Sequence, residues 1–123
     1  MPETTKIAKK NFKEMNVKNV NITLGNFKHT LQKKLKEIQS VDLVFIDGNH
    51  KEKPTIEYFK NILKYANNNT IFIIDDIHWS VGMERAWKNI KLHHRTTLTI
   101  DLFHVGIVYI KSELSKENYT IRF

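Results

Sequence analysis

Hydrophobic residues recur along the chain at two spacings, and these spacings predict its elements. Helical spacing, with apolar side chains on one face, occurs in segments at residues 3–15, 27–38, 54–66 and 80–90. Strand-like patterns occur at residues 20–24, 41–46, 70–74, 97–103 and 106–110, with a last extended piece at 119–123. The runs at 41–46 and 70–74 are almost entirely apolar, which is typical of parallel strands covered on both faces.

The order of these elements predicts an α/β fold. Helices and strands alternate along most of the chain, and such alternation builds a mostly parallel sheet with helices on both faces. Only His104 and Val105 separate the last two long strands, which predicts a C-terminal antiparallel hairpin. The three asparagines at 67–69 predict a turn. No repeat or linker interrupts the 123 residues, so we expect a single domain, 1–123.

Composition narrows the class of protein. The chain has no cysteine, which excludes a disulfide scaffold, a thiolate metal site and a cysteine nucleophile. No apolar stretch approaches the roughly 20 residues of a membrane span, and residues 1–6 lack the apolar core of a signal peptide. We therefore expect a cytoplasmic protein without a membrane partner. The net charge of +7 comes mostly from lysines on helix faces, and no arginine-rich stripe predicts a specific nucleic-acid partner.

Acidic side chains follow two of the predicted strands. Asp47 comes directly after the strand at 41–46, and Asp75 and Asp76 come directly after the strand at 70–74. Ligands of α/β sheets bind outside the carboxyl ends of the strands. Three carboxylates there repel one another unless a cation or a proton relieves them, and their oxygens suit Mg²⁺, Mn²⁺ or Ca²⁺. The alternative is that these aspartates cap turns through Asx-type hydrogen bonds and bind nothing.

Two histidines and a tryptophan accompany these aspartates. His50 and His78 follow their acidic neighbours within a few residues and are candidates for an acid, a base or a metal ligand. The alternative for each is a surface-loop histidine without a chemical role. Trp79 is either a core or lid aromatic or a platform for a substrate.

These residues resemble a known family. Segments 42–50 (DLVFIDGNH) and 71–79 (IFIIDDIHW) are similar to class I S-adenosylmethionine-dependent methyltransferases, in the branch of small-molecule O-methyltransferases related to catechol and macrocin O-methyltransferases. Residues 2–12 resemble the helix after the family's second strand. Residues 25–27 resemble the loop that borders the adenine, and residues 99–108 resemble the sixth and the reversed seventh strand. The resemblance covers nearly the whole chain and implies a Rossmann-like sheet.

The resemblance implies a site at the ends of the family's fourth and fifth strands. In metal-dependent members, the aspartates that match Asp47, Asp75 and Asp76 bind Mg²⁺, which would hold the hydroxyl of a small-molecule acceptor. Asp47 and His50 are the catalytic candidates. Macrocin-type members carry another aspartate where this chain has Asn49, and His50 is the nearest substitute as a base.

The cofactor site implied by the resemblance is incomplete in this sequence. Gly25, Asn26, Phe27 and Asp47 match positions that contact S-adenosylmethionine, but the chain contains no Gly-x-Gly loop. The sequence thus corresponds to the C-terminal two-thirds of the family's fold, truncated at its N-terminus. We expect weak or absent binding of S-adenosylmethionine, and homo-oligomers through an apolar sheet flank near 41–46.

Two other classes stay open beside the methyltransferase. A non-catalytic α/β remnant or interaction module would keep this fold without binding the cofactor. A phosphorelay receiver also groups three aspartates at strand ends, but there the acidic pair precedes the single aspartate, whereas here it follows Asp47.

Overall fold

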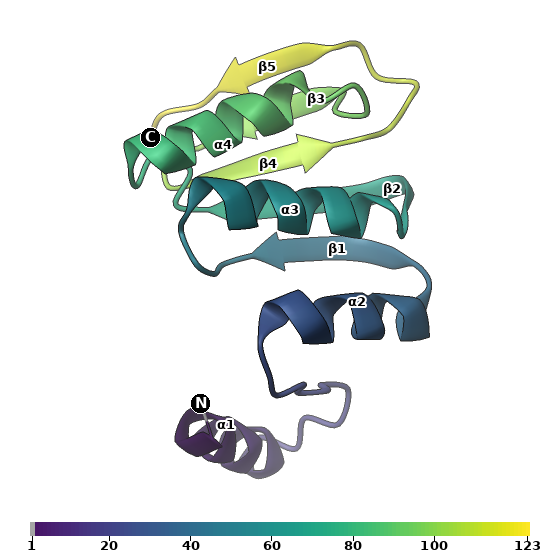
Figure 1. Ribbon diagram of the computed structural model, residues 1–123, viewed down its shortest axis with the longest axis vertical. Helices are drawn as coiled ribbons and strands as arrows, with labels where there is room; N and C mark the ends of the chain where they lie inside the picture. Colours follow the sequence, from purple (N-terminus) through teal and green to yellow (C-terminus); the bar gives the residue numbers. More distant parts are fainter. Residues whose placement is uncertain (1) are drawn as a thin grey trace. The chain divides into compact units, whose positions relative to one another are not determined.

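The computed structural model describes residues 2–123 and divides into two compact units. One unit ends at Glu37, and the other comprises Ile38–Phe123. The elements, labelled in Figure 1, are α1 (Pro2–Glu14), α2 (Phe27–Ile38), β1 (Val41–Ile46), α3 (Glu52–Leu63), β2 (Ala66–Asp75), α4 (Val81–Leu92), β3 (Leu98–Asp101), β4 (Val105–Tyr109) and β5 (Glu117–Thr120). Among residues 2–123, no helix has both the length and the apolar character needed to cross a membrane.

The second unit is built on one five-stranded sheet with the order β1-β2-β4-β3-β5. β1 pairs with β2 in parallel, and β3 pairs with β5 in parallel. β4 lies between β2 and β3 and is antiparallel to both, so four strands run one way and one runs the other. The sheet confirms the predicted mixed α/β fold, and the β3–β4 pair is the predicted hairpin.

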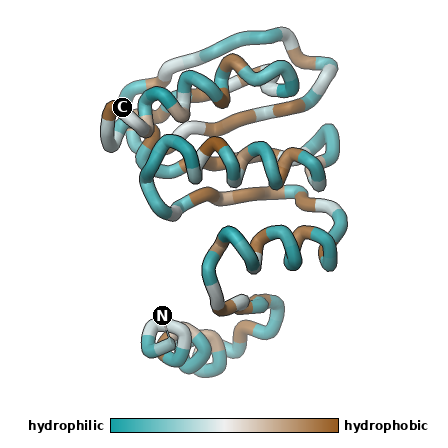
Figure 2. Tube along the Cα trace, viewed as in Figure 1, coloured by the Kyte–Doolittle hydropathy of each residue, from teal (hydrophilic) through white to brown (hydrophobic). Residues whose placement is uncertain are grey.

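Both helices of the second unit, α3 and α4, lie on the same face of the sheet (Figure 1). The ring of Phe59 on α3 meets the ring of Phe72 on β2 edge-on at 4.9 Å. On α4, the ring of Trp87 lies so close to Gly106 of β4 that a Cβ there would be 2.5 Å from it. Apolar stretches follow the strands and recur at intervals along the helices (Figure 2). The core thus lies between this one face and its two helices.

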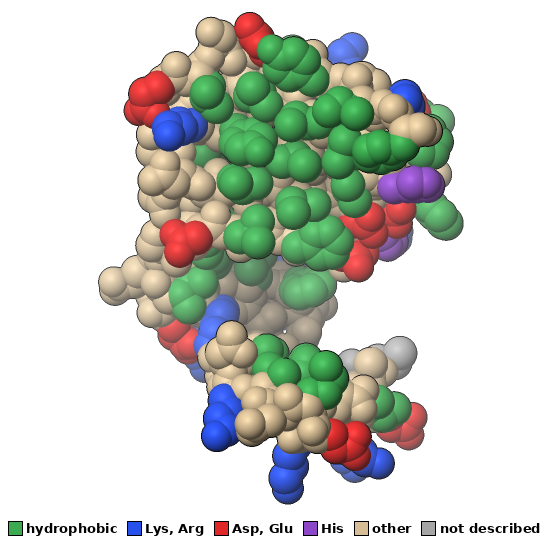
Figure 3. Space-filling view, turned by 180° about the vertical axis from the view of Figure 1, so that it is seen from behind, with side chains coloured by type: hydrophobic (Ala, Val, Ile, Leu, Met, Phe, Trp, Pro, Cys, Tyr) green, Lys and Arg blue, Asp and Glu red, His purple; other side chains and the backbone are tan. Residues whose placement is uncertain are grey.

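The opposite face of the sheet is apolar and carries no helix of its own unit. Its members alternate with the core positions and share one register across the strands; they are Leu43, Phe45, Ile71, Ile73, Leu98, Ile100, Val105, Ile107, Tyr109 and Tyr119. We call this set the uncovered face. Leu43, Phe45 and Tyr119 expose 64%, 58% and 48% of their surface, and Figure 3 shows hydrophobic side chains gathered across this side of the molecule.

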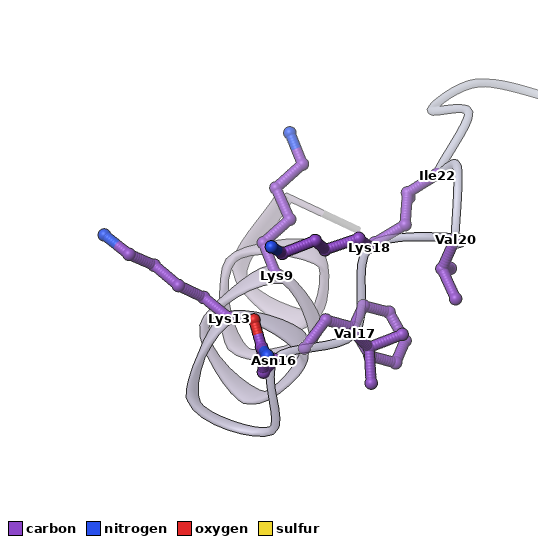
Figure 4. A pocket seen from close by; sticks show the side chains of 8 residues that line it. Lys9, Lys13, Asn16, Val17, Lys18, Val20 and Ile22 are labelled. Carbon is purple, nitrogen blue, oxygen red and sulfur yellow. The ribbon is translucent and has the colours of Figure 1, made fainter.

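The first unit contains two helices and no strand among its described residues. The predicted strand at 20–24 is wrong: this segment is irregular, and Val20 and Leu24 are exposed. Its alternation is genuine, but a strand also needs a neighbour to supply ladder hydrogen bonds. A shallow hollow lies between α1 and the following segment and is lined by lysines and apolar side chains, among them Lys9, Val17 and Ile22 (Figure 4).

The start of β2 also differs from the sequence prediction. The three asparagines predicted as a turn belong to the strand, which begins at Ala66. The Asn67 side-chain amide donates to the Val41 carbonyl and to an Asp42 carboxylate oxygen, each at 3.2 Å, and the Thr70 hydroxyl donates to the same Val41 carbonyl. The β1–β2 register shifts at this point. The side chains of Asn67 and Thr70 thus bond the Val41 carbonyl where the β1–β2 hydrogen-bond ladder is irregular, and this allows the strand to begin at Ala66 in place of the predicted turn.

Candidate functional site

The carboxyl ends of β1, β2 and β3 lie along one edge of the sheet. A row of register partners crosses the sheet there and consists of Ile46, Ile74, Gly106 and Asp101. The loops after β1 and β2 therefore begin side by side, at the edge where α/β sheets bind ligands. Seen from behind, acidic and histidine side chains gather at one margin of the molecule beside the apolar face (Figure 3).

His50 joins the two loops. Its Nδ1 atom lies 3.3 Å from an Asp76 carboxylate oxygen, and its Nε2 atom lies 3.8 Å from one of Asp47. The ring also lies 6.2 Å from the ring of Trp79, tilted by 40°. The His50 and Asp47 side chains expose 38% and 50% of their surface, so a ligand in solvent can reach them. We call His50, Asp47, Asp76 and Trp79 the His50 cluster.

The backbone of the His50 cluster adopts an uncommon conformation. Asn49, His50 and Asp76 have φ values of 66°, 37° and 53°, in the left-handed region that costs non-glycine residues free energy. Such residues concentrate at binding and catalytic sites, where the surrounding structure holds them in place. Their position directly after two adjacent strands makes this the strongest candidate site at the carboxyl edge.

The predicted metal ligands are only partly brought together. Asp47 and Asp76 both approach His50, whereas Asp75 ends β2 opposite Val105 and makes no ion pair within residues 2–123. Nowhere in this described range do three histidine, aspartate, glutamate or cysteine side chains gather closely enough to hold a metal ion. The three aspartates therefore do not form a ready-made ligand set, and their assignment to Mg²⁺ stays a prediction.

A second histidine, His78, occupies a tighter cluster at the same edge. Its Nε2 atom lies 2.7 Å from an Asp101 carboxylate oxygen, and its Nδ1 atom lies 3.3 Å from one of Glu84. Asp101 also accepts a hydrogen bond from the Phe103 backbone N–H at 2.8 Å. The Arg122 guanidinium lies 3.5 Å from Asp101 and stacks over the Phe103 ring. We call these five residues the His78 cluster.

The buried carboxylate of Asp101 is the centre of the His78 cluster. Asp101 exposes only 8% of its surface. Burial raises the pKa of this carboxyl. The hydrogen bonds from Phe103 and His78 and the nearby charges of His78 and Arg122 lower the pKa by more than burial raises it, so it lies below its ordinary value. The carboxylate is thus held ionised and fully partnered, which is the signature of a structural ion pair.

The two clusters are suited to different chemistry. Both ring nitrogens of His78 face carboxylate oxygens, so this imidazole has no lone pair directed at a ligand. In the His50 cluster, Nδ1 lies 3.3 Å from Asp76 in an ion-pair contact, and Nε2 lies 3.8 Å from Asp47, beyond hydrogen-bond distance, so Nε2 stays open to a ligand. His50 can therefore take a proton from a bound molecule, whereas His78 joins α4, β3 and the chain end.

The predicted cofactor residues are divided between the two units. Gly25, Asn26 and Phe27 belong to the unit that ends at Glu37, and Asp47 belongs to the other. Gly25 has a φ of +137°, which requires glycine. The Asn26 side-chain oxygen accepts a hydrogen bond from the Lys28 backbone N–H at 2.9 Å at the start of α2. A cofactor contact for these three residues stays a prediction.

Asp101 is the principal residue that sequence reasoning missed. It stands in a strand with alternating burial, and its position shares the covered face with Thr99. An acidic residue at an inward position of an apolar strand needs a partner, and that signal was available. Its side-chain partners, His78 and Arg122, lie 23 and 21 residues away in sequence, so no local pattern identifies the cluster.

Comparison with known proteins identifies the family to which the chain belongs. Residues 2–77 match the family model described as a methyltransferase domain, which includes α1, β1, α3, β2 and the loops that carry Asp47, His50 and Asp76. Neither a curated protein nor a solved structure shows significant similarity to the chain. The match covers more than half of the 123 residues, and the chain therefore belongs to the methyltransferase domain family.

Proposed function

We propose that this methyltransferase acts with S-adenosylmethionine and transfers a methyl group to a hydroxyl of a small molecule. The observation that carries the proposal is the His50 cluster, with an accessible imidazole between two carboxylates at the carboxyl edge of the β1–β2 pair. The family match includes this edge. An O-methyltransferase needs a group that accepts the hydroxyl proton, and His50 is placed to do so.

The residues of the cluster have distinct roles in this proposal. S-adenosylmethionine, when bound, supplies a methyl group made electrophilic by its positive sulfur. Nε2 of His50 accepts the proton of the acceptor hydroxyl, and Asp76, 3.3 Å from Nδ1, stabilises the resulting imidazolium. Asp47, half exposed at the end of β1, accepts hydrogen bonds from a bound ligand. Trp79, which exposes 71% of its surface, offers a flat apolar side for the acceptor.

The donor set fits the cofactor in part. Asp47 and Asp76 are hydrogen-bond acceptors and anions, which suit the hydroxyl, ammonium and sulfonium groups of S-adenosylmethionine. The chain lacks a Gly-x-Gly loop, which would let a backbone approach the cofactor closely. We therefore expect these 123 residues to bind the cofactor weakly, at millimolar concentrations.

Fluorescence of Trp79 tests the proposal. The second tryptophan, Trp87, exposes only 2% of its surface, so an added ligand reaches Trp79 first. S-adenosylhomocysteine, a stable analogue of the cofactor, should quench the emission at millimolar concentrations. The quenching should disappear in Trp79→Phe and weaken in His50→Ala, while His29→Ala, an exposed histidine of α2, serves as the matched control.

Two results of the same titration would contradict this proposal. No quenching at any soluble concentration favours the alternative of a non-catalytic α/β module, which the missing glycine-rich loop also supports. Tight stoichiometric binding would contradict the inference that the cofactor site is incomplete in this chain.

Metal assistance is a separate part of the proposal with its own measurement. An ion held jointly by Asp47, Asp75 and Asp76 would raise the melting temperature on addition of Mg²⁺, and Asp75→Ala would abolish that rise. Equal melting temperatures with and without Mg²⁺ would contradict the metal assignment and leave His50 as the proposed activating group.

A further inference from the structure

We propose that the uncovered face of the sheet is the interface with a second copy of this chain. The face spans β1 to β5, and the same register places two charged side chains on it, Asp75 beside Val105 and Glu117 beside Leu98, at the ends of their strands. Five strands at about 4.8 Å spacing make it roughly 24 Å wide. Monomeric proteins rarely expose continuous apolar patches beyond a few hundred Å², and in this one Leu43, Phe45 and Tyr119 are each about half exposed or more.

The composition of the uncovered face favours a partner whose own contact surface is flat and apolar. It carries neither lysine nor arginine, so an anionic membrane or a nucleic acid would gain no charge attraction from it. Acidic residues stand at its borders instead, with Asp75 at the end of β2 and Glu117 at the start of β5. A surface of matching width, flatness and polarity exists on an identical chain, and a two-fold axis makes such a surface complementary to itself.

The area and the architecture agree with a dimer. Aromatic side chains of about 200 Å² that are half exposed, such as Phe45 and Tyr119, contribute about 100 Å² each. Leu43 adds a similar area, and the seven half-buried members bring the face to roughly 400–800 Å², which overlaps the range of about 600–1,000 Å² per partner of a stable interface. Two such faces packed about 10 Å apart form a sandwich of sheets, with α3 and α4 of each copy outside.

Sedimentation equilibrium of the full chain tests the proposal. We expect a concentration-dependent species of twice the 14.6 kDa chain mass. Phe45→Lys places a charge on the face at a side chain that is already 58% exposed, so it leaves the fold intact and shifts the equilibrium to the monomer. Leu92→Lys, at a 69% exposed position of α4, is the matched control and should remain dimeric. Far-UV circular dichroism verifies that both variants are folded.

Cross-linking locates the interface, because the chain has no cysteine of its own. Ile107→Cys, at the middle of the face between Ile73 and Ile100, should be joined into dimers by a short bismaleimide, and Leu92→Cys should not. A monomeric wild-type chain at all concentrations would overturn the proposal. So would aggregates without fixed stoichiometry, equal cross-linking of both cysteines, or binding to anionic vesicles in place of dimerisation.

Discussion

The two histidine clusters at the carboxyl edge of the sheet contain the same kinds of groups and hold them differently. His78 lies 2.7 Å from Asp101, a carboxylate that is 8% exposed and has two further partners. His50 lies no closer than 3.3 Å to any carboxylate, and its Asp47 and Asp76 neighbours are more exposed than Asp101. The difference shows that an imidazole beside a carboxylate is a structural link when both nitrogens face carboxylates, and is open to a ligand when one nitrogen does not.

The largest expected effect is the loss of the buried carboxylate. Asp101→Ala leaves His78, the Phe103 N–H and Arg122 without their common acceptor, and we expect it to lower the free energy of unfolding by about 2–4 kcal/mol. Urea unfolding followed by circular dichroism measures this. The matched variant Asp47→Ala, at a half-exposed carboxylate, should change the free energy of unfolding by less than about 0.5 kcal/mol. Equal losses in the two variants would show that the two clusters do not differ in their contribution to stability.

Acid should weaken the His78 cluster through Asp101. Because the folded pKa of Asp101 lies below the ordinary 3.8, with its hydrogen bonds and ion pairs outweighing the effect of burial, its contribution to stability is complete above pH 3.8 and is lost as the pH falls through the lower folded value. Unfolding free energies measured across this range should decline less in Asp101→Asn. An identical decline in wild type and variant would contradict the assignment.

A second, higher step in the pH dependence comes from outside both clusters. Burial lowers the pKa of His93 below 6.5, as do the nearby positive charges of His94, Lys60, Arg95 and Lys116. The unfolded chain therefore binds this proton first, so stability is complete above pH 6.5 and falls as the pH drops towards the folded value. His93→Gln should remove this step and leave the acid step of Asp101. A step unchanged in His93→Gln must be assigned to another histidine.

The smallest expected effect on stability belongs to the proposed base. His50→Ala removes a 38% exposed side chain whose carboxylate neighbours remain hydrated, and we expect less than about 0.5 kcal/mol change in the free energy of unfolding. His78→Ala should lower it by about 1–2 kcal/mol because Asp101 stays buried without its partner. Thermal unfolding of both variants measures these losses. A larger loss of stability in His50→Ala than in His78→Ala would contradict the assignment of His78 as the structural histidine.

Local patterns predicted much of the fold. The apolar run at 41–46 is β1 with the same bounds, and the helical segment predicted at 80–90 is α4, which is capped by Ser80 through a hydrogen bond from the Met83 backbone N–H at 3.1 Å. Both features depend on neighbours in sequence. The strand at 20–24 was wrong because its hydrogen-bond partners would have to come from elsewhere in the chain, which alternation alone does not reveal.

The candidate site was predicted in its residue types and not in its contacts. Asp47, Asp76 and His50 were identified from their place after two strands, and the structure brings them together. The parity of β2 places Asp75 on the side of the uncovered face, with Ile73, which separates it from them. Nothing local distinguishes the free nitrogen of His50 from the fully paired ring of His78, since their partners are set by tertiary packing.

An NMR titration that follows the two imidazole rings together distinguishes their roles most sharply. Adding S-adenosylhomocysteine to the uniformly ¹⁵N-labelled chain should shift the ring nitrogen signals of His50 and leave those of His78 unchanged, since both nitrogens of His78 already face carboxylates. Shifts at His78 with none at His50, or shifts at neither, would show that the loosely held histidine is not the one that meets the ligand.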